Sequence, residues 1–134
     1  VADKSELSKF NLHFSHQIKN IMDAYWPGPL TIVFPVANNE TLGVRIPNHP
    51  FVLKLLKEYG PLFVTSANIS GEKDAINLNQ VLQYFDGKIN LVVDGGDCQI
   101  AKPSTVILAS TPIKILREGA IGVKELEIYQ QTLS

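Results

Sequence analysis

Apolar and polar positions along the chain form short blocks, and their spacing separates strands from helices. The strand-like blocks are rich in β-branched and apolar residues, and several are apolar on both faces. Such blocks indicate a sheet that is covered on both sides over part of its area. Strands are therefore expected at 30–36, 42–46, 62–67, 89–94, 105–108 and 113–116.

Helical periodicity marks the segments between these strands. Residues 50–59 place most of their apolar side chains on one face, with Pro50 suited to the first turn and Gly60 to the end. Further helices are expected at 15–25, 78–85 and 123–133, and the first fifteen residues contain no strong strand. Strands mixed with covering helices predict an α/β or α+β fold with a mixed sheet.

Length and charge restrict the class of protein. The 134 residues suit one compact domain, and the net charge of −1 gives no general basic field for coating nucleic acid. No apolar run is long enough to span a bilayer, the N-terminus does not resemble a signal peptide, and Cys98 is the single cysteine. The sequence therefore favours a cytoplasmic protein with no membrane partner, in which any anion site is built locally.

The arginines are candidates for such a local site. Among twelve basic residues only Arg45 and Arg117 are arginines, whose planar fork suits bidentate binding of carboxylate or phosphate. If Val44 and Ile46 face the core, alternation turns Arg45 to the other face, near a strand end. Both arginines could also be solvated surface residues.

Small polar residues recur where loops meet apolar runs. Thr65, Ser66 and Asn68 follow such a run, Thr31 follows the Trp-Pro-Gly-Pro turn, and Ser104 precedes another run. Hydroxyl and amide groups can hold phosphate, ribose or carboxylate without adding charge, but they also cap turns. The residues alone leave both interpretations open.

Several other chemistries lack their motifs. The sequence contains neither a phosphate-binding P-loop nor a dinucleotide fingerprint, and Ser66 lacks the nucleophile elbow of hydrolases. Three histidines and one cysteine make a zinc site improbable, and no metal site is expected.

Five segments together closely resemble the YrdC-like family of threonylcarbamoyl-AMP synthases. They are WPGPLT, GVRIP, TSANISG, PSTVI and ILREGAI, in the family's order between residues 20 and 121. The resemblance implies a twisted open mixed α/β sheet with helices on both faces around a concave cavity. It also implies a reaction in which L-threonine, bicarbonate and ATP, with Mg²⁺ carried by the ATP, give threonylcarbamoyl-AMP and pyrophosphate.

The same resemblance assigns site residues and a partner. It implies catalytic roles for Arg45 and Arg117, and a downstream transferase complex that moves the threonylcarbamoyl group to position 37 of tRNA. The substrate- and ATP-binding set that it implies is Thr31, Arg45, Thr65, Ser66, Asn68, Ser104 and Arg117.

The chain departs from the family pattern at its N-terminal end. No Lys-x-Arg motif occurs in it, so residues 1–134 are expected to form the C-terminal two-thirds of the full family domain, with activity in doubt. Two alternatives stay open. One is the carbamoyl-phosphate-using domain of hydrogenase maturation, and the other is a non-catalytic RNA-binding module. For the synthase itself, a weak contact with RNA is expected as a further partner interaction.

Overall fold

The computed structural model describes residues 1–67, 69–97 and 102–130. The chain divides into two compact units, one formed by Val1–Leu62 with Lys102–Ser134 and the other by Phe63–Ala101. Whether they act as the single domain expected from the length stays a prediction.

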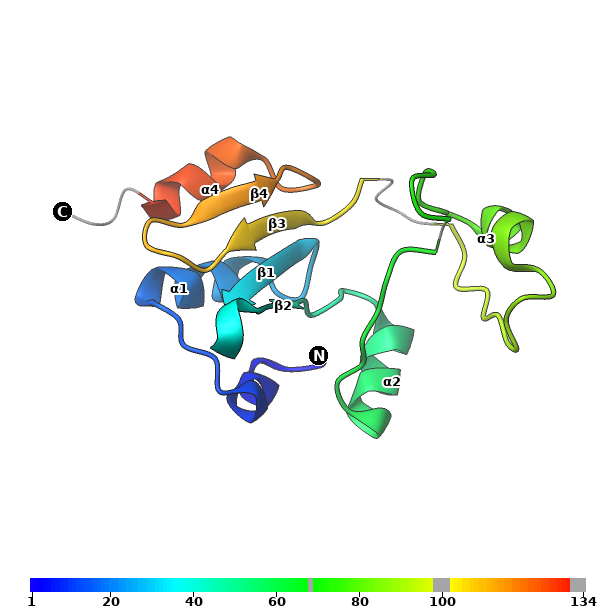
Figure 1. Ribbon diagram of the computed structural model, residues 1–134, viewed down its shortest axis with the longest axis horizontal. Coiled ribbons are helices and arrows are strands. Elements are labelled where there is room, and N and C mark those ends of the chain that lie inside the picture. Colours follow the sequence, from blue (N-terminus) through cyan, green and yellow to red (C-terminus); the bar gives the residue numbers. More distant parts are fainter. Residues whose placement is uncertain (68, 98–101, 131–134) are drawn as a thin grey trace. The chain divides into compact units, whose positions relative to one another are not determined.

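The first unit contains a four-stranded sheet in the order β2-β1-β3-β4 (Figure 1). Strand β1 pairs antiparallel with β2 and parallel with β3, and β3 pairs antiparallel with β4. The mixed sheet and the α/β class are therefore confirmed. The strands are β1 (Leu30–Pro35), β2 (Thr41–Val44), β3 (Thr105–Leu108) and β4 (Lys114–Arg117).

In the described part of the chain, four α-helices and two 3-10 helices accompany the strands. The α-helices predicted at 50–59 and 78–85 are confirmed at both ends, and the one at 15–25 begins one residue later. The helix predicted at 123–133 is confirmed as far as residue 130, and its remaining residues lie outside the described part. The elements are η1 (Lys4–Phe10), α1 (His16–Tyr25), η2 (Ala37–Asn39), α2 (Pro50–Tyr59), α3 (Leu78–Phe85) and α4 (Val123–Gln130).

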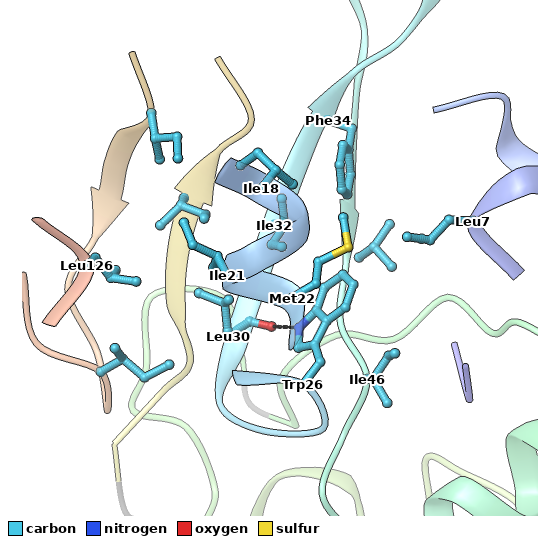
Figure 2. Packing of buried hydrophobic residues seen from close by; sticks show 14 residues of the cluster. Leu7, Ile18, Ile21, Met22, Trp26, Leu30, Ile32, Phe34, Ile46 and Leu126 are labelled. Carbon is cyan, nitrogen blue, oxygen red and sulfur yellow. Dashed lines mark hydrogen bonds between the residues drawn. The ribbon is translucent and has the colours of Figure 1, made fainter. Parts of the chain in front are cut away.

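Side chains from β1, β3, α1 and α4 pack together in one buried hydrophobic cluster, which forms the core. The side chains of β1 alternate between buried and half-buried, because successive residues of a strand point to opposite faces. On the buried face, Trp26 donates a hydrogen bond from Nε1 to the backbone oxygen of Leu30 at 2.7 Å (Figure 2). The residues of this core that Figure 2 labels are Leu7, Ile18, Ile21, Met22, Trp26, Leu30, Ile32, Phe34, Ile46 and Leu126.

The segments 62–67 and 89–94 are not strands, so the prediction was wrong for both. Phe63 is 96% exposed and Leu91 is 79% exposed. A strand needs a neighbouring strand to satisfy its backbone groups, and neither segment joins the sheet of the first unit. Apolar, β-branched composition indicates that a segment fits a pleated surface, but it does not supply the partner.

Candidate functional site

The candidate site lies at one end of the strands of the sheet, where β1 and β3 begin and β2 and β4 end. Thr31 is the second residue of β1, and Ser104 directly precedes β3. Their hydroxyls are 2.7 Å apart, within hydrogen-bond distance. Because β1 and β3 are parallel neighbours, two residues far apart in the sequence meet at the same end of the sheet.

Arg117, the last residue of β4, is tied to this hydroxyl pair. Its Nη2 and Nε donate to the backbone oxygen of Ser104 at 2.7 Å and 3.3 Å, and Nη2 also lies 3.4 Å from Ser104 Oγ. The Arg117 side chain is exposed, so these bonds orient the guanidinium without burying it. Thr31, Ser104 and Arg117 therefore form one continuous hydrogen-bonded chain.

Arg45 follows β2 and is held by the turn after α1. Its Nε donates to the backbone oxygen of Gly28 at 2.9 Å, and the Gly28 N–H donates to the oxygen of Ile46, also at 2.9 Å. A Cβ at Gly28 would lie 2.4 Å from the backbone oxygen of Tyr25, so this close approach requires glycine. The proline-flanked turn is thus a support for the arginine.

The strand register brings the two arginines into one row across the sheet. Thr31 pairs with Val106, and Val106 pairs with Arg117. On the other side, β2 ends at Val44 opposite Ile32, so Arg45 follows at the position next to Thr31. Arg45, Thr31, Val106 and Arg117 are therefore consecutive positions across the sheet, with Arg45 one residue beyond β2. Three of these residues, Arg45, Thr31 and Arg117, together with Ser104 beside Thr31, are called the arginine row.

The face of the sheet beside Thr31 carries little bulk. Thr31, Val33 and Val106 are half-buried there, and Gly43 has no side chain to place next to Thr31. A Cβ at Gly43 would lie 3.5 Å from Thr31 Cγ2. A ligand could thus approach the hydroxyls of the row closely.

The electrostatics of the row favour an anion. Partial burial lowers the pKa of Arg45 by desolvating its charge, but an arginine stays protonated near neutral pH. No described carboxylate forms an ion pair with Arg45 or Arg117, and no described group accepts from Nη1 or Nη2 of Arg45. Two guanidinium groups with open donors and uncharged hydroxyls between them suit phosphate or carboxylate oxygens.

The other predicted residues lie in the second unit. Thr65 and Ser66 are exposed and belong to no helix or strand, while Asn68 lies outside the described residues. Their participation in a site with the arginine row stays a prediction.

Thr105 is a site residue that the sequence reasoning missed. It is fully buried at the start of β3, and its hydroxyl bonds to the turn that follows β4. A β-branched residue before an apolar run indicates a strand, so the sequence pattern gave no sign that the hydroxyl of Thr105 has a polar role. The Pro-Ser-Thr triplet that leads into the strand was the available signal.

Within the described ranges, no group of three or more histidine, cysteine, aspartate or glutamate residues could hold a metal ion. Among the same residues, no helix has the length and apolarity that crossing a membrane requires.

Comparison with known proteins agrees with this geometry. A family model for Sua5, YciO and YrdC, carrying the description "Telomere recombination", matches residues 1–119. The chain belongs to the Sua5/YciO/YrdC family. The family resemblance inferred from the five segments is thereby confirmed.

Relatives in this family include proteins of known name and solved structure. The chain is 34% identical to the threonylcarbamoyl-AMP synthase of Bacillus subtilis, over 95% of this chain and 40% of that protein. The structure of Pyrococcus abyssi Sua5 complexed with L-threonine matches with a TM-score of 0.88 and 31% identity, covering 96% of this chain and 41% of Sua5. Escherichia coli YciO matches with a TM-score of 0.80 and 25% identity, covering 92% of this chain and 66% of YciO. The chain thus spans less than half the length of the first two relatives.

Proposed function

We propose that this chain belongs to a threonylcarbamoyl-AMP synthase and carries the anion-binding part of its site. The observation that supports this most is the arginine row, in which Arg45 and Arg117 flank the hydroxyl pair of Thr31 and Ser104. The name of the B. subtilis relative and the L-threonine bound to P. abyssi Sua5 point to the same reaction.

In the proposed reaction, the amine of L-threonine adds to bicarbonate and releases water to give a carbamate. A carbamate oxygen then attacks the α-phosphate of ATP, so that a new P–O bond forms and pyrophosphate leaves with the electrons of the broken bond. Such a displacement needs positioning and neutralisation of charge more than a covalent nucleophile.

The residues of the row would act as binding and charge-neutralising groups. Arg45 and Arg117 would bind substrate carboxylate and phosphate oxygens, while Thr31 and Ser104 would orient them by uncharged hydrogen bonds. We further propose that Thr65, Ser66 and Asn68 contact the nucleotide, and that Mg²⁺ enters with the ATP.

The product would then pass to a tRNA-modifying transferase complex. That complex would move the threonylcarbamoyl group to position 37 of tRNA in the cytoplasm. A weak contact of this chain with RNA fits such a transfer, although its net charge of −1 does not favour strong binding of RNA.

Pyrophosphate release by the purified chain tests this proposal. We expect release from MgATP that requires both L-threonine and bicarbonate and stops when either is omitted. The test variant Arg45→Gln should abolish the release. Its matched control, Lys54→Gln, removes an exposed positive charge on α2 and should leave the release unchanged.

Two other results would contradict the proposal. Release that needs carbamoyl phosphate instead of L-threonine would indicate the hydrogenase-maturation chemistry. A folded chain that binds RNA tightly and in a salt-dependent manner, but neither ATP nor L-threonine by calorimetry, would indicate an RNA-binding module.

A further inference from the structure

The hydroxyl of Thr105 has all its hydrogen-bonding capacity satisfied inside the protein. It donates to the backbone oxygen of Ile121 at 2.7 Å, and it accepts from the N–H groups of Gly119 at 2.9 Å and Ile121 at 3.0 Å. Thr105 is 0% exposed and, among the described residues, is the buried polar one. A hydroxyl has one donor and two acceptor positions, so this group is fully used in fixing one turn.

That turn, residues 118–122, lies directly on the segment that carries Ser104. The N–H of Ala120 donates to the backbone oxygen of Pro103 at 3.0 Å. A Cβ at Gly119 would lie 2.3 Å from that oxygen and 2.7 Å from the carbonyl carbon and oxygen of Ser104. The contact is therefore closer than any residue other than glycine allows.

The same two segments carry the predicted functional groups. Arg117 immediately precedes the turn and donates to the backbone oxygen of Ser104, and Ser104 immediately precedes Thr105. The other end of the turn is also held, because Glu118 Oε2 accepts from the N–H of Val123 at the start of α4. The Thr105 bonds therefore link the backbone next to Arg117 to the backbone next to Ser104.

We infer that Thr105 is a positioning residue of the anion site, whose buried hydroxyl holds the 118–122 turn on residues 103–105 and so fixes Arg117 relative to Ser104. The importance of Thr105 for catalysis rests on the proposed function, whereas its effect on the position of Arg117 does not. Thr105 itself touches no substrate, because its hydroxyl has no bond left to offer.

The matched variants are Thr105→Val and Thr105→Ser. Valine keeps the shape of threonine and removes the hydroxyl, whereas serine keeps the hydroxyl and removes the methyl group. Thr41→Val is the control, because Thr41 is an exposed threonine at the start of β2, on a different strand.

Arginine side-chain NMR reports on the geometry directly. The chain has two arginines, so two Nε–Hε signals are expected, and Arg117→Lys assigns one of them by removing it. We expect Thr105→Val to move the Arg117 signal and to speed its exchange with water, while Thr105→Ser and Thr41→Val leave it near the wild-type position. An Arg117 signal that is unchanged in Thr105→Val would overturn the inference, as would an equal disturbance in Thr105→Ser.

Hydrogen exchange in the unmodified protein gives a second measurement that needs no variant to fold. The amide protons of Gly119 and Ile121 should exchange slowly, because their acceptor is a fully buried hydroxyl. Rapid exchange of both protons in the folded protein would also overturn the inference.

Turnover separates this inference from the proposed function. If the wild type releases pyrophosphate, Thr105→Val should lower kcat on the order of 10²-fold, since small displacements of positioning groups have effects of this size, and Thr105→Ser should restore most of it. Unchanged turnover in Thr105→Val would contradict the positioning role. A wild type without turnover contradicts the proposed function alone, and the NMR result still decides the role of Thr105.

Discussion

Arg45 is the residue of the row with the most unused hydrogen-bonding capacity. Its Nε is bonded to Gly28, and its two terminal nitrogens have no acceptor among the described groups. The Arg45→Lys substitution keeps the positive charge and removes the fork that can hold two oxygens at once. It therefore distinguishes bidentate binding from simple charge attraction.

We expect Arg45→Lys to lower kcat/KM for pyrophosphate release roughly 10²-fold, which corresponds to about 3 kcal/mol of transition-state stabilisation. Lys54→Arg on α2 is the matched control and should change neither kcat nor KM. If Arg45→Lys proved fully active, the fork would have no role and Arg45 would act as a point charge only.

At the scale of the individual residue, an uncommon residue type is easier to recognise in the sequence than a polar group that becomes buried on folding. Arg45 and Arg117 stand out because the other basic residues are all lysines. The structure brings both arginines to the same end of the sheet. Thr105 does not stand out, because a buried hydroxyl with three backbone partners looks in the sequence like an ordinary strand threonine. Its partners lie in a segment that only the folded sheet brings close.

Strands β1 and β3 are joined near the points where they begin by side chains as well as by backbone. The hydroxyls of Thr31 and Ser104 are 2.7 Å apart in a partly buried position, so their contribution can be measured by a double-mutant cycle. We expect Thr31→Val and Ser104→Ala to show a coupling of about 0.5–1.5 kcal/mol in the free energy of unfolding by urea, the usual net value of one hydrogen bond.

A second cycle provides the control for this measurement. Thr41→Val with Ser104→Ala pairs a threonine on β2 with the same serine, although the two share no hydrogen bond in the structure. Its coupling should be close to zero. Equal couplings in the two cycles would mean that the hydroxyl pair adds nothing specific to the β1–β3 junction.

Helices were predicted well and strands less well, for a physical reason. The ends of α2 and α3 are marked locally, since His49 and Asn77 cap them and Gly60 follows α2. A helix satisfies its own backbone groups, so local signals are enough to define it. The segments 62–67 and 89–94 have the composition of strands, but whether a strand forms depends on a neighbour elsewhere in the chain.

The two units of the molecule differ in how much they bury. The first unit contains the whole hydrophobic core cluster, whereas no described residue of Phe63–Ala101 is buried. Local stability follows the burial of apolar side chains and the protection of backbone hydrogen bonds. The second unit should therefore open at a lower free energy than the sheet.

Native-state hydrogen exchange at low denaturant concentrations tests this difference. Amide protons in β1 and β3 should exchange only through global unfolding, and those of α3 through a local opening that depends weakly on denaturant. If the amides of α3 and β1 showed the same opening free energy and the same denaturant dependence, the two units would unfold as one.

The parallel pairing of β1 with β3 also determines when the arginine row can exist during folding. Between these strands the chain contains β2, α2 and the whole second unit, so their pairing closes a long loop. The chain loses conformational entropy when a loop closes, before the distant contacts can stabilise it. Such pairings therefore form slowly. No local stretch of sequence can preassemble this row, so anion binding would begin only after the central sheet has closed. A bound anion would then stabilise the folded state by mass action and raise the melting temperature of the sheet.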